Sequence, residues 1–350
     1  MPPPSSPPDV TTVYSRHSSL SQRSGYDRIA GGLNAREIVA PRGDPATALG
    51  RFGSRLLRCG SASRWYQGSS ATVEWRAARL LRKEPPGILH YLWADLDLGY
   101  LAPLVHRLSP RTKLVGTLHN PPFMLDEVMR FPGVFRHFDA LILMSTHQAD
   151  HLARMGVDRA KLHVIPHGVD TDYFRPAPCL RQDPFRVLSV GGHLRDFDLL
   201  KEVCSALPRV RFEIVGPAAQ APRFAALTNV DYRHGIDDDQ LAEAYRSASC
   251  LLLTLVDATA NNSLLEALAS GLPVVSENIG GVPDYVDDTC AELVPPKSLA
   301  GLTRAIERLA ADPTRTAGMG AAARRRAETL GWTAVSARTK NLYASLLSAP

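Results

Sequence analysis

Short apolar runs alternate with longer segments of helical periodicity from about residue 87 onward. Such alternation is typical of strand–helix–strand units that build a parallel sheet. Two series of expected strands are visible. The first lies at residues 88–93, 112–119 and 140–144. The second lies at residues 185–192, 210–216, 250–256 and 273–277. The pattern therefore predicts two α/β sheets in one chain.

Several local signals place helices and connections around these strands. Ser145 with Gln148 three residues later is a capping box, so a helix is expected to begin directly after residues 140–144. Residues 166–178 contain prolines and a glycine and suit a linker between the two series. After Pro296, apolar residues recur at helical spacing, so the chain is expected to end in helices.

The region before residue 87 carries weaker patterns. Residues 10–15 are expected to form a first strand, and residues 24–33 a glycine-containing loop that enters a helix. The first eight residues, rich in proline and serine, have neither the basic nor the apolar region of a secretion signal and are expected to be disordered.

The composition narrows the class of protein. With 350 residues, 45% hydrophobic and 21% charged, the chain suits a globular protein of two domains. No apolar run approaches the roughly 20 residues that cross a bilayer, so we expect a cytoplasmic protein. The five cysteines are odd in number and widely spaced, which argues against disulfides and zinc sites.

The net charge of +5 comes with two basic clusters, at residues 51–58 and 76–83. Such clusters fit a solvated helix face, or else peripheral contact with an anionic membrane surface or another polyanion. No aromatic residues alternate with the basic ones, so binding to nucleic acid is not expected.

Ligands of open parallel sheets bind beyond the carboxyl ends of the strands. In the second series, the corresponding loops are rich in glycine and small polar residues, and they span residues 191–196, 216–219, 257–263 and 278–281. Backbone amides of Asn261, Asn262 and Ser263, with the positive end of a helix dipole, are placed to bind a diphosphate. Glu266 would then accept hydrogen bonds from ribose hydroxyls. The alternative is that Ser263 and Glu266 form a capping box that serves only the helix.

Two further side chains are candidates. Arg195, in the tight loop after Gly191 and Gly192, is suited to neutralise phosphate charge, or else is an ordinary surface arginine. His119 ends a predicted strand and faces the ligand side of the sheet, unless it is a buried histidine bonded to backbone.

Other chemistries find little support. The spacing D-x-D, sometimes a metal site, occurs four times, so no single pair stands out and no metal is predicted. These pairs are Asp95/Asp97, Asp170/Asp172, Asp196/Asp198 and Asp237/Asp239. The hydrolase elbow G-x-S-x-G, the dinucleotide fingerprint GxGxxG and the P-loop are all absent, which argues against hydrolases, dehydrogenases and kinases.

From about residue 88 onward the chain resembles the GT-B glycosyltransferases, specifically the retaining enzymes of family four (glycosyl transferases group 1). Three segments carry the resemblance, at residues 140–176, 234–255 and 261–286, and the last of them is similar to the family's donor-binding block. The family usually has two glutamates separated by seven residues there. Here the second is Glu266, whereas Ala258, beside Asp257, stands at the first. Arg195 matches one member of an Arg and Lys pair, and no lysine matches the other.

The resemblance implies two Rossmann-like domains facing across a cleft. The acceptor side is expected at residues 1–172, the nucleotide-sugar side at residues 173–333, and residues 334–350 are expected to form a helix that crosses back to the first domain. Donor contacts would come from Gly191, Gly192, Arg195, Asp257, Asn261, Asn262, Ser263 and Glu266. His119 would lie near the donor sugar, with Ser24 and Gly25 in a loop near the acceptor and phosphate.

The implied reaction moves a sugar from a nucleoside diphosphate sugar to an acceptor hydroxyl with retention of configuration, without a metal or a cofactor. The catalytic residues would be His119, Arg195 and Glu266, and the acceptor would be a glycan, a lipid-linked group or a small molecule. Two alternatives remain open. One is a nucleotide-sugar epimerase of the same fold, and the other is a nucleotide-binding relative that has lost catalysis.

Overall fold

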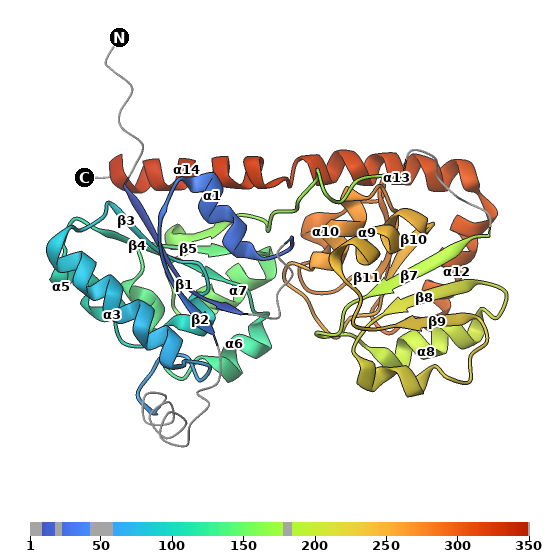
Figure 1. Ribbon diagram of the computed structural model, residues 1–350, viewed down its shortest axis with the longest axis horizontal. Coiled ribbons are helices and arrows are strands. Elements are labelled where there is room, and N and C mark those ends of the chain that lie inside the picture. Colours follow the sequence, from blue (N-terminus) through green and yellow to red (C-terminus); the bar gives the residue numbers. More distant parts are fainter. Residues whose placement is uncertain (1–8, 18–22, 43–58, 178–183, 349–350) are drawn as a thin grey trace, which may run out of the picture. The chain divides into compact units, whose positions relative to one another are not determined.

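The structure is a computed structural model that describes residues 9–17, 23–42, 59–177 and 184–348 (Figure 1). The chain divides into two compact units, of which the first comprises Met1–His167 with Trp332–Pro350, and the second comprises Gly168–Gly331. Each unit contains a six-stranded parallel sheet. The expected disorder of residues 1–8, the basic cluster at residues 51–58 and Cys179 lie outside the described residues.

The first unit's sheet has the strand order β2-β1-β3-β4-β5-β6. Its strands are β1 (Val10–His17), β2 (Arg36–Arg42), β3 (Ile88–Tyr91), β4 (Lys113–Leu118), β5 (Ala140–Leu143) and β6 (Leu162–Val164). β3 and β5 are buried at every position, as expected for parallel strands covered on both faces by helices. All the strands predicted in this region are confirmed.

Helices and 3-10 turns cover this sheet. They are η1 (Tyr26–Arg28), α1 (Ile29–Leu33), α3 (Gly68–Lys83), α4 (Ala94–Asp97), η2 (Ala102–Leu104), α5 (Val105–Leu108), α6 (Pro122–Val128), η3 (Pro132–His137), α7 (Thr146–Arg154), η4 (Arg159–Lys161) and α14 (Trp332–Ser348). The predicted helix after β5 begins at Thr146, where Gln148 Oε1 accepts a hydrogen bond from the Ser145 amide at 3.1 Å. Gln148 Nε2 also donates to the carbonyls of Leu118 and Asn120, so the start of α7 holds the loop that follows β4.

The C-terminal helix α14 completes the first unit, and it lies beside α1 in Figure 1. The His90 ring on β3 bonds to the Tyr343 hydroxyl at 2.6 Å and to the Thr117 hydroxyl at 2.7 Å. A Cβ at Gly32 would lie 2.2 Å from Ser336 Oγ, so only glycine lets α1 approach α14 this closely. The last helix is therefore part of the first unit's core.

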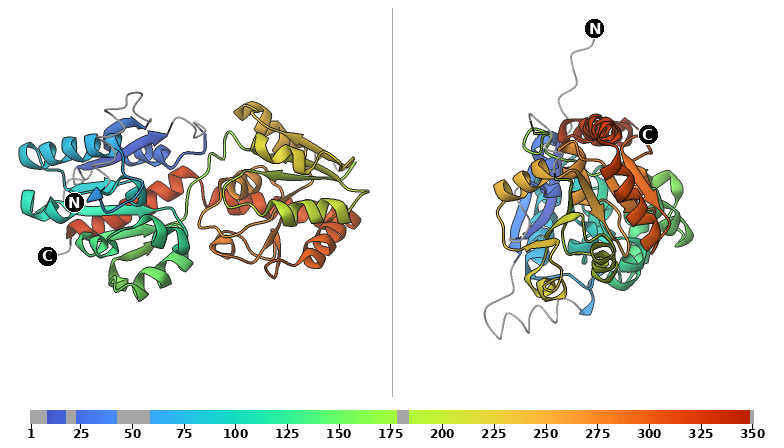
Figure 2. Two further views of the ribbon diagram at one scale, coloured as in Figure 1. Left: turned by 90° about the horizontal axis from the view of Figure 1, so that it is seen from below. Right: turned by 90° about the vertical axis from the view of Figure 1, so that its right-hand side faces the viewer.

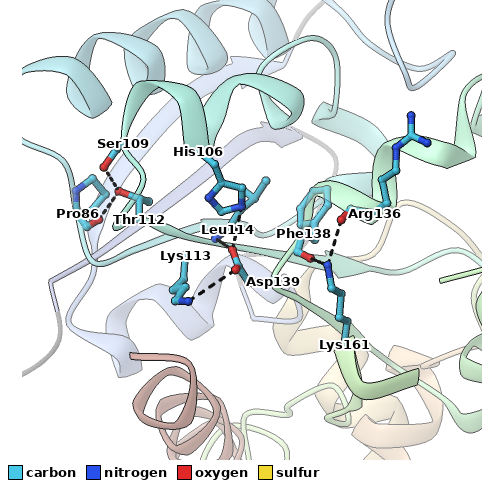
Figure 3. A network of polar contacts seen from close by, with 10 residues as sticks. All are labelled: Pro86, His106, Ser109, Thr112, Lys113, Leu114, Arg136, Phe138, Asp139 and Lys161. Atoms are coloured by element: carbon cyan, nitrogen blue, oxygen red, sulfur yellow. Dashed lines mark hydrogen bonds and ion pairs between the residues drawn. The ribbon is translucent and has the colours of Figure 1, made fainter. Parts of the chain in front are cut away.

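Polar contacts hold the amino ends of β4 and β5, which lie opposite the loops that follow the carboxyl ends of the strands (Figure 3). Asp139 Oδ2 accepts a hydrogen bond from the Leu114 amide at 2.7 Å and lies 3.3 Å from His106 Nε2. Lys161 Nζ donates to the carbonyls of Arg136 and Phe138. These charged groups bond to backbone and to one another, which suits a structural role at the amino ends of the strands.

The second unit's sheet has the order β12-β11-β10-β7-β8-β9. Its strands are β7 (Arg186–Val190), β8 (Arg211–Val215), β9 (Val230–Arg233), β10 (Cys250–Leu253), β11 (Val274–Glu277) and β12 (Ala291–Val294). This is the doubly wound order of Rossmann folds, in which the direction of winding reverses between the first and fourth strands. Here that switch point lies between β7 and β10.

Helices cover both faces of this sheet, as the turned views of Figure 2 show. They are α8 (Phe197–Ala206), η5 (Ala218–Arg223), α9 (Asp238–Ser247), α10 (Asn262–Ala269), α11 (Val282–Tyr285), α12 (Leu299–Ala311) and α13 (Pro313–Glu328). Residues of α9, α10 and α13 share one apolar cluster, and residues of α8 and α12 share another. No helix among the described residues is both long enough and apolar enough to cross a bilayer.

Candidate functional site

The loops at the switch point of the second sheet pack closely against one another. Gly191 has φ of 103°, and a Cβ there would lie 2.9 Å from Arg195 Nη2. A Cβ at Gly192 would lie 2.5 Å from Pro217 Cγ in the loop after β8. Both positions therefore require glycine, the first for its left-handed backbone and the second for the close approach of two loops.

Arg195 connects the end of β7 to the start of α10. Its Nε and Nη2 donate to the Val190 carbonyl at 3.0 and 2.7 Å. Nη2 also lies 3.1 Å from Ser263 Oγ and 3.3 Å from Asn261 Oδ1. Burial lowers the pKa of Arg195 to about 10, which still leaves the guanidinium charged at neutral pH. A fixed cation thus lies at the amino end of a helix, an arrangement that favours an anionic ligand.

The beginning of α10 corrects one prediction. Asn261, not Ser263, is the N-cap, and its Oδ1 accepts a hydrogen bond from the Leu264 amide at 3.1 Å. Ser263 is the second residue of the helix, and its hydroxyl donates to the Val190 carbonyl at 3.1 Å. The alternative of a Ser263–Glu266 capping box is therefore wrong. Asn261, Asn262 and Ser263 are all residue types that cap helices. Ser263 is engaged instead by its contacts with β7 and Arg195.

Glu266 is 4% exposed and bonds to a residue of another helix. Its Oε2 accepts a hydrogen bond from the hydroxyl of Tyr245 on α9 at 2.8 Å. Burial, followed by the charge of Glu266, raises the pKa of Tyr245 well above its ordinary value, so the hydroxyl stays protonated and donates. The positive charge of Arg195 acts on both Glu266 and Tyr245.

Asp257 lies in the loop after β10, which contacts the loop after β11. Its Oδ1 accepts a hydrogen bond from the Ala258 amide at 2.7 Å. The Gly281 amide donates to the Ala258 carbonyl at 2.7 Å, and a Cβ at Gly280 would collide with both Asp257 Oδ1 and Ala258 O. Asp257 is half-buried, whereas Asn262 is exposed at the first position of α10. The predicted donor loops are thus neighbours within the second unit.

His119 lies at the carboxyl end of β4 in the first unit. Its ring stacks on Trp93 with centroids 3.9 Å apart and meets the edge of Tyr26 at 4.7 Å. Burial lowers the pKa of His119 to about 4, so the imidazole is neutral at neutral pH. Because its Nε2 lies 2.8 Å from the carbonyl oxygen of Leu92, that nitrogen carries the proton and donates.

The buried carboxylate of Asp95 holds the loop that contains His119. Asp95 Oδ2 accepts hydrogen bonds from the amides of His119 and Asn120, both at 2.8 Å, and from Asn120 Nδ2 at 2.6 Å. Asp95 Oδ1 is buried without a hydrogen-bond partner. Burial raises the pKa of Asp95 to about 6, although these hydrogen bonds oppose the shift.

The other D-x-D pairs also serve local structure. Asp97 accepts hydrogen bonds from the Ser15 amide and hydroxyl and from the Ser70 hydroxyl. Asp196 and Asp237 are the N-caps of α8 and α9. Within the described residues, no three His, Cys, Asp or Glu side chains are grouped so that they could hold a metal ion.

Ser24 and Gly25 lie in the first unit, in the turn that leads into η1. The Gly25 carbonyl accepts a hydrogen bond from the Arg28 amide, and the next residue, Tyr26, carries the ring that meets His119. Ser24, Gly25 and His119 thus belong to the first unit, and the other candidates belong to the second.

Sequence reasoning missed several residues of these clusters. Tyr26 and Trp93 enclose His119, Asp95 supports it, and Tyr245 contacts Glu266. Tyr26 lies in the predicted loop at residues 24–33, next to Gly25, and Trp93 ends the strand predicted at residues 88–93. Their places next to Gly25 and at the end of a strand were therefore usable signals. Nothing local indicates the contacts of Asp95 or Tyr245, because their partners lie 24 and 21 residues away.

Comparison with known proteins gives a consistent result for both units. Residues 26–173 match the family model described as Glycosyltransferase Family 4, and residues 185–312 match the one described as Glycosyl transferases group 1. The D-inositol 3-phosphate glycosyltransferase of Streptomyces avermitilis is 28% identical over 302 residues, which cover 74% of this chain and 65% of that protein. The chain thus spans about two thirds of the length of this curated relative.

Two solved structures share the architecture. A glycosyltransferase from Rickettsia africae superposes with a TM-score of 0.72 at 14% identity, covering 98% of this chain and 100% of that one. Anabaena HepE, in complex with UDP-glucose, gives a TM-score of 0.70 at 15% identity, covering 96% and 100%. These likenesses establish the fold, which is GT-B. Since both halves match models of one enzyme group, the chain belongs to the group 1 glycosyltransferases of family 4.

Proposed function

We propose that this protein is a retaining glycosyltransferase that moves a sugar from a nucleoside diphosphate sugar to an acceptor hydroxyl. The observation that carries the proposal is the Arg195 guanidinium, held at the amino end of α10 beside the switch point of the second sheet. Family membership and the UDP-glucose bound to Anabaena HepE support the same substrate class.

The mechanism we propose is electrostatic. When the bond between the anomeric carbon and the diphosphate breaks, negative charge grows on the departing phosphate. The Arg195 guanidinium and the first amides of α10 would stabilise that charge, because they are already oriented and need no reorganisation. Glu266 would accept hydrogen bonds from the ribose of the donor. His119, neutral at neutral pH, would bind the donor sugar as a hydrogen-bonding group rather than as a cation.

We propose that no metal ion takes part. In each D-x-D pair at least one carboxylate already serves another partner, namely backbone amides at Asp95, Asp97 and Asp170 and helix caps at Asp196 and Asp237. The charge of the diphosphate would be balanced by Arg195 and the helix dipole. Full turnover in excess chelator is expected, whereas a complete loss that manganese or magnesium restores would contradict the scheme.

A screen of nucleotide sugars tests the main proposal. Unfolding midpoints would be measured with UDP-, GDP- and ADP-sugars, and mass spectrometry would follow release of the nucleoside diphosphate with sugar phosphates, inositol phosphates and lipid-linked glycans as acceptors. We expect at least one donor to raise the midpoint and to be consumed only when an acceptor is present. Interconversion of sugars without transfer would indicate an epimerase, and binding without turnover would indicate an inactive relative.

A second proposal concerns the outer face of α3. Trp75 is 59% exposed, and the Arg79 guanidinium lies 4.8 Å from the centre of its ring. Arg76, Arg82 and Lys83 are also exposed, whereas the helix's one carboxylate, Glu74, is buried. A cationic face that carries an exposed indole suits contact with an anionic membrane surface.

Sedimentation with vesicles tests this contact. The protein should pellet with vesicles that contain phosphatidylglycerol and not with pure phosphatidylcholine vesicles, and added salt should release it. Replacing Trp75 and Arg79 by serine should abolish pelleting, whereas Arg325→Ser, an exposed arginine of α13, should not. Equal pelleting of both variants would rule out the α3 face.

A further inference from the structure

Tyr245 is a fully buried residue whose hydroxyl reaches a carboxylate of the candidate donor site. It lies on α9, is 0% exposed, and donates to Glu266 Oε2 on α10 at 2.8 Å. Nothing in the local sequence pairs the two residues, which are 21 positions apart. A buried hydroxyl that meets a largely buried carboxylate restricts the direction of both groups, since burial limits their access to water.

The ring of Tyr245 is enclosed by apolar residues of the second unit. It packs edge-on against Phe174, with centroids 5.8 Å apart and planes at 88°, and belongs to the apolar cluster that contains α10 and α13. Because the ring is enclosed, the hydroxyl cannot swing away from Glu266 without disturbing the core. The Tyr245 hydroxyl is therefore a fixed donor.

The same hydroxyl lies next to the proposed phosphate end of the site. Ser263 and the positive charge of Arg195 both act on Tyr245, opposing the effect of burial on its pKa. Arg195 Nη2 in turn lies 3.1 Å from Ser263 Oγ. Tyr245 thus bonds to the carboxylate assigned to the ribose and lies within the field of the cation assigned to the diphosphate.

We propose that Tyr245 is a positioning residue for donor binding: its hydroxyl orients the Glu266 carboxylate so that this carboxylate accepts the ribose hydroxyls of the nucleotide. The inference rests on the proposed function and adds a residue to it. Tyr245 does not touch the ligand and acts through Glu266. Its removal should therefore weaken recognition of the ribose specifically, rather than binding of every part of the nucleotide.

The test compares nucleotides with and without ribose hydroxyls. Dissociation constants of UDP and GDP, and of their 2′-deoxy and 3′-deoxy counterparts, would be measured by calorimetry for the full chain and for Tyr245→Phe. In the unmodified protein, loss of the recognised hydroxyl should weaken binding about tenfold, since hydrogen bonds to charged groups are the stronger class. In Tyr245→Phe, UDP or GDP should bind about fivefold more weakly, and the deoxy penalty should fall below about threefold.

Tyr173→Phe is a matched control, because it removes a hydroxyl that donates to the Asp239 carboxylate at 2.6 Å in the same unit. This variant should keep the full deoxy penalty. A second measurement guards against general destabilisation: adding Tyr245→Phe to Glu266→Gln should change affinity no further, since the tyrosine acts only through the carboxylate.

The outcomes separate the two proposals. A deoxy penalty that is unchanged in Tyr245→Phe would overturn the positioning role and leave the proposed function standing. Additive losses in the double variant would also overturn it. If the unmodified protein binds none of UDP, GDP and ADP and no sugar derivative of them, the proposed function fails first, and the positioning role fails with it.

Discussion

Both units bury carboxylates near the carboxyl ends of the strands of a parallel sheet, but the hydrogen-bond partners of these carboxylates differ between the units. In the first unit, Glu74 accepts hydrogen bonds from three backbone amides, those of Gly99, Tyr100 and Leu101, and from two tyrosine hydroxyls. In the second unit, Glu266 bonds to Tyr245 and lies within the field of a charged arginine.

The difference indicates what each carboxylate does. A carboxylate that bonds to several backbone amides fixes the chain's path, and it serves the fold even where it lies near a loop. The second unit also contains such a group, since Glu277 accepts hydrogen bonds from the amides of Leu255 and Lys297. The cluster around Arg195 combines a fixed cation with a helix amino end, which is why we assign the donor to it.

The largest expected effect concerns Arg195. Replacing it by alanine should lower kcat/KM for sugar transfer about 100- to 1000-fold, because removal of one preorganised donor to a developing oxyanion has effects of this size. Steady-state rates of nucleoside diphosphate release would measure the loss. Arg211→Ala, at the amino end of β8, is the matched control and should retain full activity. Similar rates in both variants would refute the assignment of the diphosphate to Arg195.

Replacing Glu74 should lower the stability of the protein and leave its nucleotide affinity unchanged. Glu74→Leu leaves five donors without their acceptor, four of them buried, so the free energy of unfolding should fall by about 3 kcal/mol or more. Nucleotide affinity should stay unchanged at a temperature where the variant is folded. Urea unfolding and calorimetry would measure the two quantities. A large loss of affinity with little loss of stability would show that the first unit's carboxylate is functional.

Asp95 should make stability depend on pH. Its pKa is raised from 3.8 to about 6 by burial, so the folded state binds this proton more tightly than the unfolded state does. The stabilisation is therefore present below pH 4 and is lost as the pH rises through 6. The unfolding free energy of the protein relative to Asp95→Asn should fall by up to about 3 kcal/mol between pH 4 and pH 7.

Denaturant unfolding of both proteins across this range would measure the difference. The shifts of His119 and Glu74 occur in both proteins and largely cancel in the comparison. A difference that stays constant with pH would mean that Asp95 is ionised throughout, as its three N–H donors favour.

The smallest effect concerns the cap of α10. Asn261→Ala should lower the free energy of unfolding by about 1 kcal/mol, because the Leu264 amide loses its acceptor. Asn262→Ala, at the exposed neighbouring position, should change stability by less than half as much. Thermal unfolding of the two variants would rank them. A greater loss in Asn262→Ala would place the start of the helix elsewhere.

The sequence predicted the interior strands of both sheets and missed the strands at their edges. The strands that the pattern did not indicate are β2, β6, β9 and β12, which are the four edge strands of the two sheets. Interior parallel strands are buried on both faces and read as continuous apolar runs. An edge strand such as β9 is exposed or half-buried along its length, so its residues carry a weaker pattern.

Prediction of the candidate site had a similar limit. The rule that ligands bind beyond the carboxyl ends of parallel strands nominated the loops after β7, β8, β10 and β11, because it depends only on recognising the strands. It could not choose among Asn261, Asn262 and Ser263 as the cap, since that choice depends on the contact of Ser263 with Val190, 73 residues away. Asp95 was recognised only as part of a repeated spacing, and its contact with the His119 amide appears only in the folded chain.

The placement of α14 has a consequence for synthesis. The second unit is one continuous stretch, whereas the first unit needs residues from both sides of it, among them Tyr343 against His90. During translation we therefore expect the second unit to fold while the first still lacks its last helix and exposes apolar surface to chaperones. A chain that ends at Gly331 and is released from the ribosome should resist protease across the second unit and be digested in the first.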